Sequence, residues 1–270
     1  LFERPPSRGR CVWAGALTRP DSLVGVADGV DYVYNLTSRL VIENGSVRRT
    51  FVDGNQHLIA ACSRARTVKS YVFTSNVSPY GDAGDDLVSE DHPVAPAHAL
   101  GAVMVEAEQT IMRAAREHRF PAIILRCGSI YGPDRDLVDA VEQGIATLYG
   151  DGRNFVSHIH IDDLLDILAA VATDGQPGAI YNVGDDQPLR QIELLSEVRQ
   201  RLGMVPPRAF SPAAALAAGL DPAIVGTLTA SVRLDNSRLR HDLGLTLRYP
   251  SVRAWLDERL PVEEEVLVAI

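Results

Sequence analysis

The amino-acid sequence predicts a doubly wound α/β protein, in which helices cover both faces of a mainly parallel sheet. Short apolar runs alternate with segments of helical period, which is the pattern of repeated strand–helix–strand units. Residues 121–126 are almost wholly apolar, as expected of a strand that is covered on both faces. The chain has 270 residues and can therefore bury one large core, or a core and a smaller lobe.

Five strands are expected along the chain. Each is a short and mainly apolar run that is bounded by polar or turn-forming residues. They are predicted at residues 11–17, 31–36, 68–74, 121–126 and 179–183.

Helices are expected where apolar residues recur at intervals of three and four. Residues 20–28 read as a short helix that Gly29 closes, and Asp53 is expected to cap the next helix. Asp162 and Asp163 are expected to cap a later one. Two further helices are predicted over residues 100–118 and 191–202.

The order of these elements predicts two lobes. Residues 1–130 together with 155–184 carry the regular strand–helix alternation and form the doubly wound lobe. Residues 131–154 together with 185–270 are less regular, and they include an Ala- and Pro-rich stretch at 205–230. We expect them to form a smaller, substrate-binding lobe.

Composition limits the partners. The net charge of −9 argues against nucleic acid, whose phosphates require clustered Lys and Arg. No run of 18 apolar residues is present, so we expect no membrane partner. No secretory signal is visible, and the three cysteines, Cys11, Cys62 and Cys127, are odd in number and lie in apolar stretches. These features predict buried thiols and a cytoplasmic location.

Seven segments, in this order and spacing, resemble the extended short-chain dehydrogenase/reductase superfamily, also called the NAD-dependent epimerase/dehydratase family. The resemblance runs from about residue 11 to about residue 260. Any one segment is a weak signal, whereas seven in order are a strong one. They are GALTRPDSL (15–23), DGVDYVYNLT (28–37), DGNQHLIAA (53–61), VFTSNVSPYG (72–81), RCGSIYGP (126–133), HIDDL (160–164) and IYNVG (180–184).

The resemblance implies a nicotinamide dinucleotide and a small-molecule ligand, and it also allows a homodimer. In such folds ligands bind at the carboxyl ends of the parallel strands. The resemblance places Glu3 and Arg4 at the end of the family's second strand, near the adenosine ribose. Glu3 would favour NAD, because a carboxylate suits the ribose 2′-hydroxyl, and Arg4 would favour NADP, because a guanidinium suits the 2′-phosphate. The other residues that the resemblance places around the cofactor are Thr37, Ser38, Ser75, Cys127, Gly128 and Ser129.

The chain departs from the family in its glycines. A dinucleotide fold needs a glycine-rich turn from strand into helix, where backbone N–H groups meet the pyrophosphate. None of the 21 glycines falls in such a pattern, and Leu1 and Phe2 correspond to the end of the family's second strand. About 40 residues of the family's first unit therefore have no counterpart. We expect NAD or NADP as cofactor if an N-terminal segment supplies this unit, and no cofactor otherwise.

The same departure affects the predicted strand at residues 11–17. In the strand order of such sheets its partner would be the second strand, so without that partner it would carry unpaired backbone groups and stand apart. One alternative is that residues 265–270, a run of apolar character, supply the first strand in a permuted arrangement. The other is that they form a plain apolar tail.

The family's catalytic Tyr–Lys pair is also absent. Leu100 stands at the Tyr position and Met104 at the Lys position, and Lys69 is the only lysine of the chain. The family's Ser position holds Asn76, with Ser78 nearby. The usual proton transfer, in which a Lys lowers the pKa of the Tyr phenol, is therefore not available.

Other residues could carry chemistry in the same crevice. Tyr80 and Tyr131 could act as acids in a nonstandard site with Asn76 and Ser78, or they could simply wall the pocket. We expect Asn76, Ser78, Tyr80, Ser129 and Tyr131 to face one cavity, closed by Leu100 and Met104.

Two histidine hypotheses complete the candidates. His158 and His160 share one strand face, but no third ligand stands at a recognisable spacing, so no metal is predicted. His98 lies just before the long helix and is a candidate substitute base.

Three functions stay open at this point. The first is an NAD(P)-dependent oxidoreductase or epimerase-like enzyme with nonstandard catalytic residues. The second is a non-catalytic dinucleotide- or ligand-sensing protein of the NmrA type. The third is a non-redox lyase or cyclase that reuses the crevice, since the fold alone does not choose among them.

Overall fold

A parallel four-stranded sheet forms the centre of the computed structural model, which describes residues 12–38 and 46–261. The strand order is β1–β2–β4–β9, and every neighbouring pair is parallel. Four of the five predicted strands are thereby confirmed in place and direction. Their bounds are Tyr32–Asn35 (β1), Ser70–Asn76 (β2), Ala122–Cys127 (β4) and Ile180–Val183 (β9).

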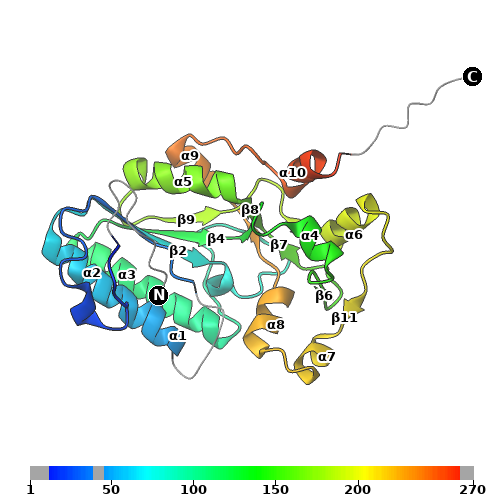
Figure 1. Ribbon diagram of the computed structural model, residues 1–270, viewed down its shortest axis with the longest axis horizontal. Helices are drawn as coiled ribbons and strands as arrows, with labels where there is room; N and C mark the ends of the chain where they lie inside the picture. The colour runs from blue at the N-terminus through cyan, green and yellow to red at the C-terminus, as the bar shows by residue number, and fades with distance from the viewer. Residues whose placement is uncertain (1–11, 39–45, 262–270) are drawn as a thin grey trace, which may run out of the picture.

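Helices cover both faces of this sheet (Figure 1). On one face lie α2 (Gly54–Ala65) and the long α3 (Ala99–His118), and on the other lie α5 (Ile161–Asp174) and α9 (Ser237–Leu243). Each layer has its own apolar core, the first around Phe73 and Ile124 and the second around Val72 and Leu125. Alternate residues of β2 and β4 thus enter opposite cores, which explains why both strands are apolar throughout.

The residues expected as helix caps take other roles. A short α1 (Ser46–Arg48) and a π-helical turn η2 (Arg49–Asp53) run directly into α2, so Asp53 lies inside helical backbone and makes an ion pair with Arg48. Helix α5 is capped by the His160 ring, whose Nδ1 accepts from the N–H of Asp162. Asp53 stands at the residue before α2, as predicted, but its side chain makes no capping hydrogen bond because its own backbone is already helical. Asp162 and Asp163 lie in the first turn of α5 and do not cap it, so that prediction was wrong.

The predicted strand at residues 11–17 is wrong for its described part. Residues 12–17 form no strand, and residues 20–28 form only a 3₁₀ turn, η1 (Pro20–Leu23), followed by further turns. Instead of a sheet partner, Ala16 has the Ser22 hydroxyl, which accepts from its N–H and donates to its carbonyl. No strand of the described chain is available to pair with this segment.

Strand β1 is consequently an edge of the sheet. Its register places Tyr34 beside Val72, so Tyr32 and Tyr34 point to the face that α5 covers farther along the sheet. Both tyrosines are 41% exposed. Within residues 12–38 and 46–261 no strand pairs with the outer edge of β1.

The second half of the chain adds short strand pairs around a third core. That core joins helices α4 (Leu137–Glu142), α6 (Gln191–Arg201) and α10 (Val252–Arg259), and we call it the α4–α6–α10 core. Strands β5 (Ser129–Tyr131) and β8 (His158–His160) pair in parallel at the junction with the central sheet. The division of the chain into two lobes at these residues stays a prediction.

The remaining elements are small. Three further pairs are formed by β3 (Leu87–Val88) with β12 (Arg233–Leu234), β6 (Leu148–Tyr149) with β11 (Ala209–Phe210), and β7 (Phe155–Val156) with β10 (Leu189–Arg190). The other helical segments are η3 (Ser78–Tyr80), α7 (Pro212–Ala217) and α8 (Pro222–Thr229). None of the helices in the described chain is both long enough and apolar enough to span a bilayer.

Candidate functional site

The polar residues at the end of β2 are tied to the protein itself. The Asn76 Oδ1 accepts from the backbone N–H of Ser78 at 2.9 Å and from its hydroxyl at 2.5 Å. The Ser75 hydroxyl donates to Glu108 on α3 at 2.6 Å. Ser75 and Ser78 are buried, whereas Asn76 is half-buried. Of these three candidates, Asn76 is therefore the one with surface left to meet a ligand.

Tyr80 belongs to a buried polar network that no single motif reveals. Its hydroxyl donates to the Asn182 Oδ1 at 2.7 Å, and the guanidinium of Arg126 lies over its ring, 4.6 Å from the centre. Arg126 is in turn held by Glu108. Burial raises the pKa of Tyr80. The network therefore holds the Tyr80 phenol inside the protein, and its O–H already donates a hydrogen bond to Asn182.

Asn182 carries this network across to the second half of the chain. Its side-chain amide donates to the carbonyl of Val88 at 2.8 Å, and its backbone N–H donates to Glu90 at 2.8 Å. The loop after β2 is thereby fastened to β9. Sequence reasoning did not single out Glu108, Arg126 or Asn182, although a charged residue such as Arg126 within an apolar strand was a usable signal.

Tyr131 lies in a different cluster. Its ring packs edge-on against His160 at 5.1 Å and Trp255 at 5.2 Å, next to His158. Its hydroxyl is buried and finds no hydrogen-bond partner among the residues that the structure describes. Burial, followed by the charges of Asp185 and Asp163, raises its pKa. Tyr131 and Tyr80 are therefore packed into separate apolar clusters.

The turn after β4 approaches the neighbouring chain closely. A Cβ on Gly128 would lie 2.5 Å from the carbonyl oxygen of Ser157, so only glycine fits at this position. The buried Cys127 thiol donates to the Leu125 carbonyl at 3.7 Å, and burial raises its pKa to about 12. Ser129, by contrast, is exposed. Of the three cofactor candidates in this turn, only Ser129 offers a free side chain.

The turn after β1 offers two more hydroxyls. Thr37 donates to the Asn35 Oδ1 at 2.5 Å and is half-buried, whereas Ser38 is exposed. Asn35 is itself held by Asn55 and Tyr71 in the first core. Glu3 and Arg4, the ribose candidates, lie outside the described residues.

The two positions where the sequence resemblance places the family's Tyr and Lys are apolar and packed in the protein. Met104 is 1% exposed and belongs to the first core, against which Leu100 also packs. The nearby His98 caps α3, with its Nδ1 accepting from Gly101 and its Nε2 lying 3.1 Å from the Thr227 hydroxyl. Burial lowers the pKa of His98, so its ring is neutral at pH 7.

The candidates with available surface therefore form a smaller set than predicted. They lie at the carboxyl ends of β1, β2 and β4, which is the ligand-binding edge of an open α/β sheet. They are Thr37, Ser38, Asn76 and Ser129.

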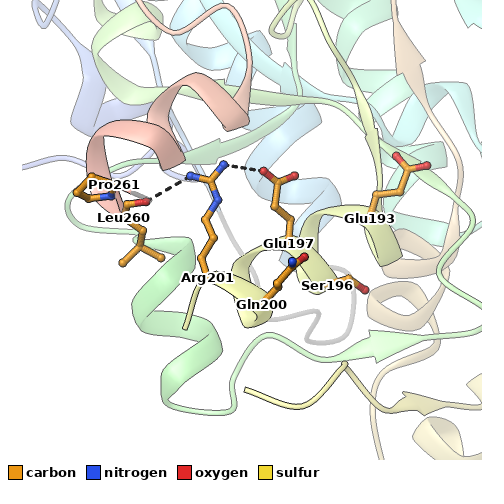
Figure 2. Close-up of a pocket in the computed structure, with 7 residues that line it drawn as sticks. All are labelled: Glu193, Ser196, Glu197, Gln200, Arg201, Leu260 and Pro261. Atoms are coloured by element: carbon orange, nitrogen blue, oxygen red, sulfur yellow. Dashed lines mark hydrogen bonds and ion pairs between the residues drawn. The ribbon is translucent and has the colours of Figure 1, made fainter. Parts of the chain in front are cut away.

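Two depressions of the surface lie elsewhere. Figure 2 shows one of about 710 Å³ between α6 and the chain that leaves α10, where Arg201 bridges Glu197 and the carbonyl of Leu260. The second, of about 350 Å³, lies between the end of α3 and the turn before β9. Neither is lined by a candidate residue. Residues 12–38 and 46–261 also contain no cluster of His, Cys, Asp and Glu that could hold a metal ion.

A nicotinamide dinucleotide fits this edge only in part. The turn after β1 and the ends of β2 and β4 have hydroxyl and amide groups suited to ribose or nicotinamide. No described strand runs into a helix through a glycine-rich turn, so the donors that a pyrophosphate needs are not provided by these residues. The described residues therefore do not by themselves form a complete dinucleotide site.

Comparison with known proteins agrees with the architecture. Residues 3–184 match the model of the NAD dependent epimerase/dehydratase family. The chain belongs to this family. The sequence resemblance to the extended short-chain dehydrogenase/reductase superfamily is thereby confirmed, as is the α/β fold with a parallel sheet.

The curated relatives of this family member are distant. A dTDP-glucose 4,6-dehydratase of Streptomyces griseus is 28% identical over 191 residues, which are 66% of this chain and 58% of that protein. The dTDP-D-glucose 4,6-dehydratase of Homo sapiens is 24% identical over 184 residues, 63% of this chain and 52% of that one. The chain thus spans little more than half the length of these relatives.

Solved structures show the same fold. DesIV, a dTDP-glucose 4,6-dehydratase from Streptomyces venezuelae with NAD and TYD bound, superposes with a TM-score of 0.73 at 22% identity, over 90% of this chain and 78% of that one. A functionally unknown conserved protein from Silicibacter pomeroyi has a TM-score of 0.68 at 26% identity, over 86% of this chain and 79% of that one.

Proposed function

We propose that this family member acts on a small molecule of the sugar-nucleotide kind, as an atypical NAD(P)-dependent epimerase/dehydratase-like enzyme with a nonstandard active site. Three of the four relatives named above are dTDP-glucose 4,6-dehydratases, and another solved relative, MoeE5, was crystallised with UDP-glucose and NAD. The observation that supports a nonstandard site is the burial of Met104 in the first core, at the position where the resemblance places the family's Lys.

In this proposal the ligand lies over the carboxyl ends of β2 and β4. Asn76 and Ser129 have available surface there and can offer an amide and a hydroxyl to hydroxyls of a sugar. Thr37 and Ser38 stand at the end of β1, on the side where a dinucleotide would lie. NAD or NADP would in addition require a glycine-rich phosphate loop, which residues 1–270 do not contain.

A second candidate function, a ligand-sensing protein without catalysis, is favoured by the state of the two phenols. The Tyr80 hydroxyl donates its hydrogen bond to Asn182, and the Tyr131 hydroxyl is buried. The pKa of each is raised above its ordinary value, which makes proton release at neutral pH harder. A protein that binds and does not convert its ligand would need neither phenol to react.

The deciding experiment measures binding and turnover on the same samples. We expect dTDP-glucose or UDP-glucose to raise the melting temperature of the protein, and the Ser129→Trp variant to lose this shift because the indole fills the ligand-binding edge. Ser63→Trp, on the exposed side of α2, is the matched control and should keep the shift.

The same mixtures, with NAD or NADP added well above millimolar concentration, are then analysed by mass spectrometry. Loss of water or a change in redox state of the sugar supports the enzyme. Binding without any change of mass or of retention against sugar standards supports the sensor. A shift that persists in Ser129→Trp, or no shift with any sugar nucleotide, would contradict the proposed site.

A further inference from the structure

Two buried carboxylates hold the C-terminal arm, which we define as residues 248–260. Asp163, in the first turn of α5, accepts from the backbone N–H groups of Arg248 at 2.6 Å and Tyr249 at 3.0 Å. Asp185, in the turn that follows β9, accepts from the N–H of Val252 at 3.1 Å. Its other oxygen accepts from Gln187 at 3.2 Å. The arm is therefore docked on the central sheet through one carboxylate of α5 and one in the turn that follows β9.

Both carboxylates are enclosed and lack a cationic partner. Asp163 is 3% exposed and Asp185 is 1% exposed. Within the part of the chain that the structure describes, neither takes part in an ion pair. A desolvated carboxylate without a counter-charge is costly, and two of them in one enclosure repel each other.

The groups that face Asp185 supply no positive charge. Burial lowers the pKa of His158, on β8, to about 4, so this ring is neutral at pH 7. Tyr131, on β5, is neutral and enclosed. The adjacent Asp186 is occupied by Arg240 of α9, at 2.7 Å.

Farther along, His160 is packed on Tyr249, near Asp162, Arg248 and Glu258. Burial also lowers the pKa of His160, which removes this ring as a source of charge at pH 7. Among residues 12–38 and 46–261, the hydrogen-bond donors to the carboxylates of Asp163 and Asp185 are all backbone N–H groups.

The arm matters because it fastens the α4–α6–α10 core. Val252, Trp255 and Leu256 are buried in that core. The other polar links of α10 are partly exposed ion pairs, such as Arg253 with Glu197 and Arg259 with Asp136, and such pairs contribute little. The depression in Figure 2 lies where Leu260 and Pro261 follow α10 past α6, so movement of the arm would reshape it.

We propose that Asp185 is a proton-controlled clamp, which docks the C-terminal arm when it carries a proton and loosens the arm when it is ionised. A proton on Asp185 removes one of the two negative charges from the enclosure, whereas ionisation restores the cost of burying both. Opening of the arm lets water reach the carboxylate and relieves that cost.

The direction of the pH dependence follows from the pKa. Burial raises the pKa of Asp185 from 3.8 to about 7. The docked state therefore binds a proton more tightly than the open state does. Protonation of Asp185 therefore stabilises the docked arm relative to the open arm. This stabilisation is complete below about pH 4 and is lost as the pH rises through about 7. Above that pH, Asp185 is ionised in both states and the stability of docking no longer changes with pH.

Hydrogen exchange of the intact 270-residue protein tests the clamp. After correction for intrinsic exchange rates, protection of the amides of residues 248–260 should fall at least about 10-fold between pH 5 and pH 8. In Asp185→Asn, which cannot ionise, protection should not change over this range, and at pH 8 it should exceed that of the wild type. Asp186→Asn, which alters the adjacent exposed carboxylate, should keep the fall.

A wild-type arm whose protection does not change with pH, or an Asp185→Asn variant that retains the full fall, would overturn the proposal. A second measurement does not depend on that variant. Trp255 lies in the arm, and Trp13→Phe removes the only other tryptophan, which is exposed. Acrylamide quenching of Trp255 should then increase as the pH rises from 5 to 8. Quenching that stays constant from pH 5 to pH 8 also rejects the clamp.

Discussion

Glu108 and Arg126 form an almost completely buried ion pair between helix α3 and strand β4. The Arg126 Nε and Nη2 both donate to the Glu108 Oε2, at 3.1 and 2.7 Å, and each side chain is 5% exposed. Removal of one member leaves the other charge buried without compensation. We expect Glu108→Gln to lower the free energy of unfolding by about 3 to 5 kcal/mol, as measured by chemical denaturation.

The control for this variant is a pair on the surface. Glu106 lies one half-turn before Glu108 on α3 and pairs with Arg48, with side chains 42% and 50% exposed. Glu106→Gln should lower the free energy of unfolding far less than Glu108→Gln does, because solvent screens the exposed pair. Equal losses in the two variants would show that burial does not set the strength of the Glu108–Arg126 pair.

The two candidate phenols should respond differently to loss of the hydroxyl. Tyr80→Phe removes the donor to Asn182 and should lower the free energy of unfolding by about 1 to 3 kcal/mol, because a buried acceptor is left unpaired. Tyr131→Phe removes a buried hydroxyl that has no partner, so stability should be unchanged or higher.

The same variants test the two tyrosines as proton donors. Once a substrate is known, a true general acid would show a loss of about 100-fold or more in rate. We expect a smaller change for both, since neither hydroxyl is free to meet a ligand. A 100-fold loss in a variant that is fully folded by circular dichroism would restore that tyrosine as the acid.

Gly128 should be required for stability irrespective of any cofactor. Gly128→Ala places a Cβ 2.5 Å from the Ser157 carbonyl oxygen, and a strand-end backbone must shift to relieve that contact. A loss of about 1 to 3 kcal/mol is expected in thermal or chemical unfolding. Gly184→Ala is the matched control, since the nearest atom to its Cβ would be 3.4 Å away. If Gly128→Ala is as stable as Gly184→Ala, the close approach is not a constraint.

The buried thiols should be inert in the native protein. Burial raises the pKa of Cys62 to about 11 and that of Cys127 to about 12, so at pH 8 almost no thiolate exists to react. In a Cys11→Ser background, a chromogenic disulfide should label these two thiols only as fast as the protein unfolds. Rapid labelling that is insensitive to stabilising salts would contradict their burial.

Binding of NAD or NADP to the 270-residue chain should be weak. No glycine-rich turn presents backbone donors to the pyrophosphate, so titration calorimetry should detect no binding tighter than about millimolar, equivalent to about 4 kcal/mol. AMP serves as a comparison, because it lacks the pyrophosphate bridge. Micromolar binding of NAD, with AMP much weaker, would mean that another segment rebuilds the phosphate site.

The central strands could be predicted because their apolar runs are long enough to enter two cores at once. Val72 and Phe73 are adjacent in sequence and lie in opposite layers, which only a strand covered on both faces allows. The segment at residues 11–17 has a similar apolar character but no neighbouring strand in the described chain. Strand propensity without a pairing partner does not make a strand.

The candidate site was harder to predict, because its side chains are turned inward by residues far away in sequence. The sequence predicted that Ser75 and Tyr80, at the end of β2, could contact a ligand. In the structure the Ser75 hydroxyl donates to Glu108 and the Tyr80 hydroxyl donates to Asn182. Asn182 is separated from Tyr80 by a hundred residues. A hydrogen-bond partner so far along the chain can be identified only when the strand order of the sheet is known. The local spacing of residues around Tyr80 does not predict it.

During synthesis, strand β9 leaves the ribosome well after its neighbour β4, because β4 ends at Cys127 and β9 begins at Ile180. Residues 128–179 lie between the two strands, and they include helix α5, which covers the face that β4 and β9 share. In a nascent chain that has emerged only to residue 150, β4 is therefore an unpaired edge of the sheet, and the Tyr80 hydroxyl still lacks its acceptor on Asn182. Until residue 183 leaves the ribosome, the half-made sheet is open to pairing with other strands, and this interval is when a chaperone would contribute most.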